Sequence, residues 1–196
     1  MTRAAIKRPL PQLAARGLTL IELLVTVAIS IVLVAIAVPQ MRELIARKRV
    51  ASIANELASD IRYARAQVVE QNQPIWINFG SSTNFTCYVI YTEGGLSQVC
   101  DCARATGVVC AAATNPSIPL KTVYIQRSTG VQLTSAAPYL RYLKPVGEPT
   151  PFFGGTSTAT VTSTLGYAVN LDLNTPVSAK LCAASGLASE FGNCAQ

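Results

Sequence analysis

The chain has 196 residues and no His, which excludes histidine metal ligands and histidine-based acid–base catalysis. Its formal charge of +6 is uneven, because four of its 16 basic residues and none of its 10 acidic residues lie in the first 17 positions. The remainder carries 12 − 10 = +2, so the charge balance gives no reason to expect a nucleic-acid partner. The length suffices for one domain with a core plus an anchor.

Residues 1–16 form a basic segment with two prolines and no acid, which is typical of a targeting leader that takes no part in the fold. An apolar stretch follows. From Leu23 to Val38 only Thr26 and Ser30 are polar, and neither is charged. A helix over residues 18–38 would be roughly 30 Å long, enough to cross the hydrocarbon core of a bilayer.

Glu22 lies inside this apolar stretch. A carboxylate in hydrocarbon costs about 2.5–3.5 kcal/mol, so we interpret Glu22 as a functional group that needs a partner. The alternative for residues 1–37 is an ordinary secretory signal peptide, since Ala35-Ile-Ala37 is a small-x-small cleavage site. The length of the apolar run and its carboxylate disfavour that alternative, and a simple single-pass anchor does not explain Glu22.

The string from Arg16 to Pro39, RGLTLIELLVTVAISIVLVAIAVP, resembles the N-terminus of a type IV prepilin. In that family a basic leader ends in Gly, Glu is the fifth mature residue, and Pro is common at mature position 22. Gly17, Leu18, Glu22 and Pro39 stand at these places, although Phe or Met is more usual where Leu18 stands. The resemblance implies that a prepilin peptidase cleaves between Gly17 and Leu18 and methylates the new amine of Leu18.

Two assembly roles follow from the prepilin resemblance. In a fibre of packed apolar helices, the new amine of Leu18 and the carboxylate of Glu22 would be buried charges that cancel and set the axial stagger. The alternative for Glu22 is a carboxylate at the level of the lipid headgroups. Pro39 removes a backbone donor, so we expect it to permit bending or local melting of the helix, or simply to kink it at the membrane surface.

The chain beyond Pro39 predicts an amphipathic helix over residues 40–72. Glu43 and Arg47 have the i, i+4 spacing of a helical ion pair, and Asn72-Gln73-Pro74 ends the pattern. We therefore expect one helix over residues 18–71, bent at Pro39. Its second half has apolar residues every three or four positions, which indicates one buried face. These residues are Val50, Ile53, Leu57, Ile61, Ala64 and Val68.

Residues 73–196 predict an antiparallel β-sheet that covers this helix. In residues 74–79 the side chains of Ile75, Ile77 and Phe79 share a face, and a second strand is predicted over residues 85–92, where Cys87, Val89 and Tyr91 share a face. Further strands are predicted at 121–127, 139–143 and 177–182, with a hairpin around Gly166 at 158–173; residues 93–119 and 144–157 are expected to be loops.

The segment Ala54 to Ala66, ANELASDIRYARA, resembles one found in FimT/FimU minor pilins and H-type (GspH) pseudopilins, with matches at Glu56, Arg62 and Arg65. The resemblance covers residues 16–80. It implies the α+β pilin architecture, in which one long N-terminal helix packs on an antiparallel sheet, and the periodicities agree with it independently.

The six cysteines all follow the apolar stretch, and their even number favours disulfides in an oxidising compartment over a metal site. The resemblance to pilins, many of which have a C-terminal disulfide loop, implies the pair Cys182–Cys194. Cys100 and Cys102 are too close in sequence to be expected to pair with each other. Two pairings remain: Cys87–Cys100 with Cys102–Cys110, which we favour, or Cys87–Cys102 with Cys100–Cys110.

The resemblance implies a minor pilin, a structural subunit that is incorporated into a type IV pilus or primes its assembly. The alternative is a pseudopilin of a type II secretion system. The implied partners are prepilin peptidase and other pilins or pseudopilins, and the implied location is the bacterial inner membrane, with a single span and a periplasmic C-terminal part, followed by the fibre. The cysteines favour this orientation, because the basic residues flank the stretch equally.

Neither an enzyme nor a cofactor or metal site is expected, because no base accompanies a nucleophile and the cysteine spacing is not that of a zinc site. A DNA-uptake pilin is a weaker alternative. Phosphate binding requires clustered basic residues, and those after Arg65 are dispersed, with none from Leu181 onward.

Overall fold

The computed structural model describes residues 19–94, 99–104, 108–110, 116–143, 148–151, 157–173 and 179–194. The chain divides into two compact units, Met1–Met41 and Arg42–Gln196, and the second of these is the head.

Helix α1 spans Leu20–Gln71 and includes Pro39, which confirms the long helix expected from the sequence over the residues that are described. The bend expected at Pro39 stays a prediction. The helix ends before Asn72, whose φ of 49° is left-handed, a conformation that Asn adopts more readily than most residues.

Two antiparallel sheets are present among the described residues, where the sequence predicts one. The first sheet has the order β3-β2-β1-β5-β6 and the second has the order β4-β7-β8-β9. The strands are β1 Ile75–Ser81, β2 Phe85–Thr92, β3 Pro119–Gln126, β4 Val131–Ser135, β5 Tyr139–Leu143, β6 Glu148–Pro151, β7 Thr158–Ser163, β8 Ala168–Asp172 and β9 Lys180–Ser185. Two short helices, η1 Arg127–Thr129 and α2 Ala188–Phe191, also lie in the described part of the head.

The hairpin predicted around Gly166 is confirmed as β7 and β8, and Gly166 has the positive φ of 84° that such a turn requires. Strand β4 is not predicted from the sequence. Strand β6 lies within 144–157, where a loop is expected, so that part of the prediction is wrong. The two prolines of β6 are typical of a loop, but among the described residues β6 pairs only with β5, at the edge of its sheet, where a missing backbone donor is tolerated.

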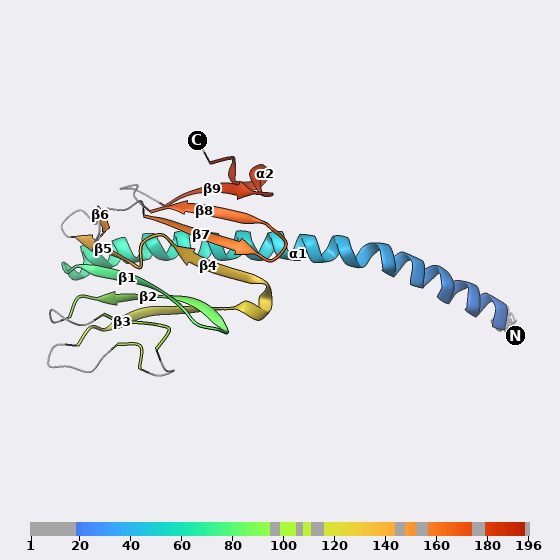
Figure 1. Cartoon of the computed structure of the whole chain (residues 1–196), viewed down its shortest axis with the longest axis horizontal. Helices are drawn as coiled ribbons and strands as arrows, with labels where there is room; N and C mark the ends of the chain where they lie inside the picture. Colours follow the sequence, from blue (N-terminus) through green and yellow to red (C-terminus); the bar gives the residue numbers. More distant parts are fainter. Residues whose placement is uncertain are drawn as a thin grey trace, which may run out of the picture. The chain divides into compact units, whose positions relative to one another are not determined.

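The core of the head forms between α1 and both sheets, which lie against the helix (Figure 1). The predicted helical stripe supplies it: Val50, Leu57, Ile61, Ala64 and Val68 are fully buried, while Ile53 is partly buried against the same cluster. Each large apolar side chain buried in this way contributes about 1.5–3 kcal/mol. The predicted facing of the first two strands is also confirmed, because Ile75 and Ile77 lie in this core and Phe79 packs against it.

The other face of the first sheet has a second, smaller apolar cluster. Cys87, Val89 and Tyr91 of β2 pack there with Cys100 and Cys102 of the following loop. Strand β2 is therefore buried on both faces, by α1 on one side and by a disulfide-bonded loop on the other.

Cys87 pairs with Cys102 and Cys100 with Cys110, so the favoured pairing of Cys87 with Cys100 and of Cys102 with Cys110 is wrong. The loop conformation explains the difference. The backbone N–H of Asp101 donates to the carbonyl of Val109 over 2.8 Å, and its carboxylate accepts a 2.8 Å bond from the N–H of Ala103. This turn brings Cys110 beside Cys100 and directs Cys102 toward β2.

Gly80 of β1 makes room for the Cys87–Cys102 bridge. It pairs with Cys87 across the sheet, and a Cβ at this position would lie 2.9 Å from Sγ of Cys102 and 3.1 Å from Sγ of Cys87. A third disulfide joins Cys182 to Cys194, the pair that the resemblance to pilins implies, and closes the segment that contains α2.

Candidate functional site

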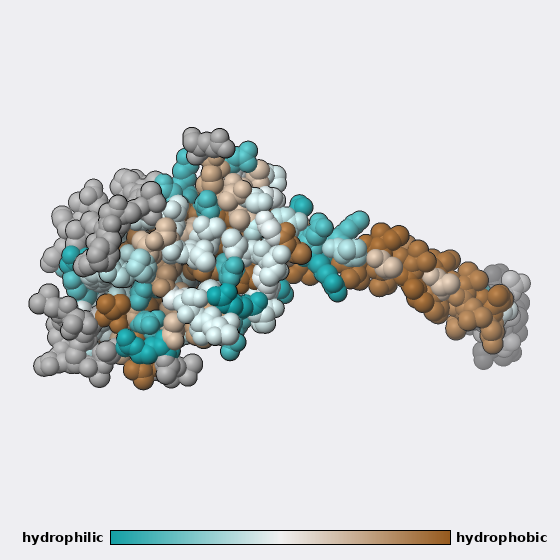
Figure 2. All heavy atoms as spheres, viewed as in Figure 1, coloured by the Kyte–Doolittle hydropathy of each residue, from teal (hydrophilic) through white to brown (hydrophobic). Residues whose placement is uncertain are grey.

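The first unit presents an apolar helical surface. From Leu20 to Val38 every large apolar side chain is exposed, by fractions between 42% at Val38 and 78% at Leu20. Figure 2 shows this part of α1 as an almost unbroken hydrophobic surface. By length and composition, α1 is a helix that can cross a membrane. A helix that is apolar on all sides requires burial in lipid or among other helices.

The two polar residues of this surface satisfy their own hydroxyl groups. Oγ1 of Thr26 donates to the carbonyl of Leu23 over 2.9 Å, and Oγ of Ser30 donates to the carbonyl of Thr26 over 2.7 Å. Such bonds within the helix let a hydroxyl enter an apolar environment without a partner from outside. Thr26 and Ser30 therefore do not oppose burial of the helix.

Glu22 is the one charged residue of this surface, and it is exposed in the first turn of α1. Its backbone N–H donates to Oγ1 of Thr19 over 3.3 Å, which gives the helix a threonine cap. The helix N-terminus also favours a nearby carboxylate. Among the predicted site residues, Gly17 and Leu18 lie outside the described residues, so their geometry with Glu22 stays a prediction.

Pro39 lies inside α1, as the sequence predicts, and is exposed. At 1.5 Å per residue it is roughly 25 Å along the helix from Glu22. The structure therefore does not bring these two residues together, and any role of Pro39 is separate from the charge at Glu22.

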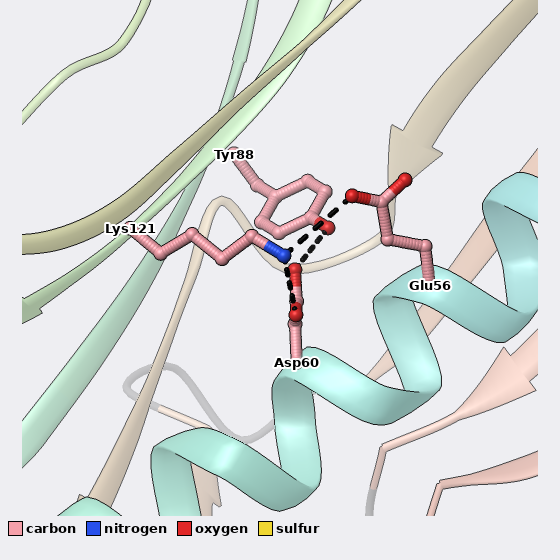
Figure 3. Close-up of polar contacts among 4 residues, drawn as sticks. All are labelled: Glu56, Asp60, Tyr88 and Lys121. Atoms are coloured by element: carbon pink, nitrogen blue, oxygen red, sulfur yellow. Dashed lines mark hydrogen bonds and ion pairs between the residues drawn. The ribbon is translucent and has the colours of Figure 1, made fainter.

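A cluster of polar residues in the head was not predicted from the sequence (Figure 3). Asp60 of α1 is buried, with 6% of its surface exposed. Its Oδ2 accepts a 2.6 Å hydrogen bond from the phenol of Tyr88 on β2, and its Oδ1 accepts one of 2.7 Å from Nζ of Lys121 on β3. Oε1 of Glu56, one helical turn earlier, lies 3.5 Å from the same Nζ.

The electrostatics of this cluster argue against Lys121 or Tyr88 acting as a nucleophile or a general base. The hydrogen bond to Asp60 raises the pKa of Lys121, and burial raises the pKa of Tyr88 with the Asp60 bond acting in the same direction. Both side chains therefore keep their protons at neutral pH, whereas a nucleophile or general base must lose one. The cluster instead joins α1 to the first sheet.

One sequence signal could have revealed Asp60. It stands three residues after Leu57 and four before Ala64, so it lies on the buried stripe that those residues define. A charged residue on such a stripe needs a partner. Among the described residues, no group of three or more Cys, Asp or Glu is placed to hold a metal ion.

Comparison with known proteins identifies a family. The family model described as type II transport protein GspH matches residues 54–182, which is more than half of the chain. No match was found among curated proteins or among solved structures. The GspH family consists of structural, pilin-like proteins, and membership implies association with other pilins or pseudopilins. The apolar helix that precedes the match fits a single-pass membrane anchor. The long helix packed on antiparallel sheets and the family match together show that the chain belongs to the GspH family of pilin-like proteins.

Proposed function

We propose that the chain is a minor pilin, a structural subunit that enters a type IV pilus, or primes its assembly, after processing by prepilin peptidase. The observation that carries this proposal is the apolar surface of α1 from Leu20 to Val38, which is exposed all round and interrupted by a single charge, Glu22. A fibre of such helices would bury this surface and give the carboxylate a cationic partner.

Two stages follow from this proposal. The helix first anchors the chain in the bacterial inner membrane, with the head in the periplasm, an oxidising compartment that suits its three disulfides. The peptidase removes residues 1–17 and methylates the amine of Leu18. The helix then leaves the lipid and becomes part of the fibre core, where the new amine of one subunit pairs with the carboxylate of Glu22 of another.

The proposal is tested with the full chain in a bacterium that has a prepilin peptidase and type IV pili. Mass spectrometry should find a methylated Leu18 at the mature N-terminus, and fibres sheared from the cell surface should contain the chain. In Gly17→Val a side chain obstructs the scissile bond, so the leader should remain attached. A mature N-terminus at Val38 would instead show that an ordinary signal peptide had been removed, and it would overturn the proposal.

A second candidate, a pseudopilin of a type II secretion system, is favoured by the GspH match itself. The two candidates share processing and assembly chemistry, so the mature N-terminus does not separate them. Deletion of the gene separates the two candidates. Loss of surface pili with normal protein secretion supports the minor pilin, and loss of secretion with normal pili supports the pseudopilin. Pro39 and the three disulfides favour the pilus, because H-type pseudopilins often lack both features.

A further inference from the structure

A groove of about 260 Å³ lies at the start of the head, between the first head turns of α1 and two turns that connect strands. Arg42, Ile45 and Arg49 line it from α1. Thr129 lines it from the connection between β3 and β4, and Leu165 from the tip of the β7–β8 hairpin. All of these residues belong to the head.

Two hydrogen bonds give the groove a fixed shape. The backbone N–H of Thr164 donates to the carbonyl of Gly130 over 2.9 Å and joins the two turns. Nη1 of Arg49 donates to the carbonyl of Thr129 over 2.8 Å, which holds this guanidinium against the wall. A guanidinium has five N–H donors, and this bond uses one of them.

Arg42 and Arg49 differ from the neighbouring cations Arg47 and Lys48, which have acidic partners. Arg47 lies 3.9 Å from Oε2 of Glu43 and stacks over the ring of Tyr167, and Lys48 forms a 3.0 Å ion pair with Glu190. Within the part of the chain that the structure describes, the guanidinium of Arg42 has no hydrogen bond or ion pair, and no carboxylate lines the groove.

The rim of the groove is apolar. Leu165 is 53% exposed at the hairpin tip, and Ile45 is 42% exposed on α1. A groove with two guanidinium groups and an exposed aliphatic rim matches the chemistry of the lipid–water interface, where phosphate oxygens lie next to glycerol and acyl carbons. The position of the groove in the chain also fits this interface, because Arg42 follows Pro39 by three residues, directly after the apolar stretch ends.

We propose that this groove binds the phosphate of an anionic phospholipid headgroup while the chain is anchored in the membrane. Arg42 and Arg49 bind phosphate oxygens, and Leu165 and Ile45 contact the apolar part of the interface. The inference rests on the membrane-anchored stage of the proposed function and adds a regulatory step to it. Lipid binding holds the head at the membrane surface, and the contact must break when the subunit is extracted into a fibre.

The test uses the full chain reconstituted into vesicles of phosphatidylcholine, with or without phosphatidylglycerol. Hydrogen exchange should show that phosphatidylglycerol protects backbone amides at residues 42–49, 129–131 and 164–166. The phosphatidylglycerol fraction that gives half-maximal protection should rise about tenfold for Arg42→Ala or Arg49→Ala, because each variant removes a charge-assisted hydrogen bond to a phosphate oxygen.

Lys48→Ala is the matched control, since it removes the same charge from the position next to Arg49 on α1 but lies outside the groove and is already paired with Glu190. For Lys48→Ala, the phosphatidylglycerol fraction that gives half-maximal protection should stay within twofold of the value for the parent chain. An equal effect of Lys48→Ala would show general charge attraction and overturn the proposal. Protection by inorganic phosphate in phosphatidylcholine vesicles would assign the groove to free phosphate instead of lipid, which also overturns it.

Failure of this inference and failure of the proposed function give different results. A chain that does not float with phosphatidylcholine vesicles lacks a working anchor, and both are then wrong. A chain that floats but shows no protection by phosphatidylglycerol keeps the anchor and loses only the lipid site. Protection that depends on the ratio of protein to lipid, without phosphatidylglycerol, would assign the groove to a second copy of the chain and overturn the lipid site.

Discussion

The phenol of Tyr88 donates a 2.6 Å hydrogen bond to Oδ2 of Asp60, at the edge of the large apolar cluster between α1 and the sheets. Tyr88 is 1% exposed and Asp60 is 6% exposed. Because Oδ1 of Asp60 also accepts a bond from Lys121, this one carboxylate joins α1 to two strands of the first sheet. A polar contact at this depth fixes the axial position of the helix against the sheet, since any slip would leave both groups buried without partners.

We expect Asp60→Ala to lower the free energy of unfolding by about 2–3 kcal/mol, because it leaves the buried Tyr88 phenol without its acceptor. Tyr88→Phe should cost about 1 kcal/mol. The measurement is guanidinium denaturation of the full chain in detergent, followed by fluorescence of Trp76, the single tryptophan, which lies in the first sheet.

Glu56→Ala serves as the control for that series. Glu56 is 47% exposed and lies 3.5 Å from Lys121, so water screens its contribution, which should stay below about 0.5 kcal/mol. Equal losses for Glu56→Ala and Asp60→Ala would show that the buried hydrogen bond has no special importance.

Gly80→Ala should destabilise the head by about 1–3 kcal/mol, because the added Cβ would meet both sulfur atoms of the Cys87–Cys102 bridge. In the Cys87→Ser, Cys102→Ser background the bridge is absent, and the same substitution should cost less than about 1 kcal/mol. Denaturation midpoints of the four chains give the coupling. A penalty that does not depend on the bridge would contradict this account.

Stability should fall at alkaline pH through buried tyrosines. Burial raises the pKa of Tyr142 to about 12, partly opposed by the guanidinium of Arg65. A tyrosine in the unfolded chain titrates near about 10, so above that pH the unfolded state binds fewer protons than the folded state and the free energy of unfolding decreases. The loss continues until the pH reaches the folded pKa.

Tyr142→Phe should flatten this decrease by up to about 1.4 kcal/mol per pH unit between about pH 10 and about pH 12. Denaturation midpoints measured across that range for both chains test it, with recovery of the midpoint at neutral pH as the control for chemical damage. The Tyr142→Phe chain should still lose some stability there, because burial also raises the pKa of Tyr88 and Tyr91. Identical slopes for the two chains would refute the assignment to Tyr142.

Glu22→Ala should lower incorporation into sheared fibres tenfold or more, because the amine of a neighbouring Leu18 would be buried without a counter-charge. Cleavage of the leader and insertion into the membrane should not change. Thr26→Val is the matched control, since its hydroxyl bonds within its own helix and should not affect assembly. The ratio of fibre to membrane protein measures both, and normal incorporation of Glu22→Ala would remove the pairing role.

Much of the head was predictable because its signals are local. The spacing of Leu57, Ile61 and Ala64 alone predicts a buried helical face, and the alternation of Ile75, Ile77 and Phe79 alone predicts a strand face. Strand β6 was not predictable in this way. Its two prolines are typical of a loop, and only its pairing with β5 at a sheet edge makes it a strand.

The disulfides were likewise predictable only in part. Export and an even cysteine count predict that the cysteines pair, but Cys100 and Cys102 differ by two positions and have similar loop-closure entropies with Cys87, so spacing cannot rank the two pairings. The turn at Asp101 and the absence of a side chain at Gly80, which leaves room for the Cys87–Cys102 bridge, decide between the two pairings.

The sequence by itself determined the long apolar helix with one carboxylate at Glu22, because hydropathy and helical period are properties of a continuous segment. Only the tertiary structure decided that Asp60 accepts bonds from Tyr88 and Lys121, and that Arg42 and Arg49 share a groove with Leu165. These residues are far apart in the chain. Their contacts depend on strand register and on the packing of strands against α1, which no local pattern encodes.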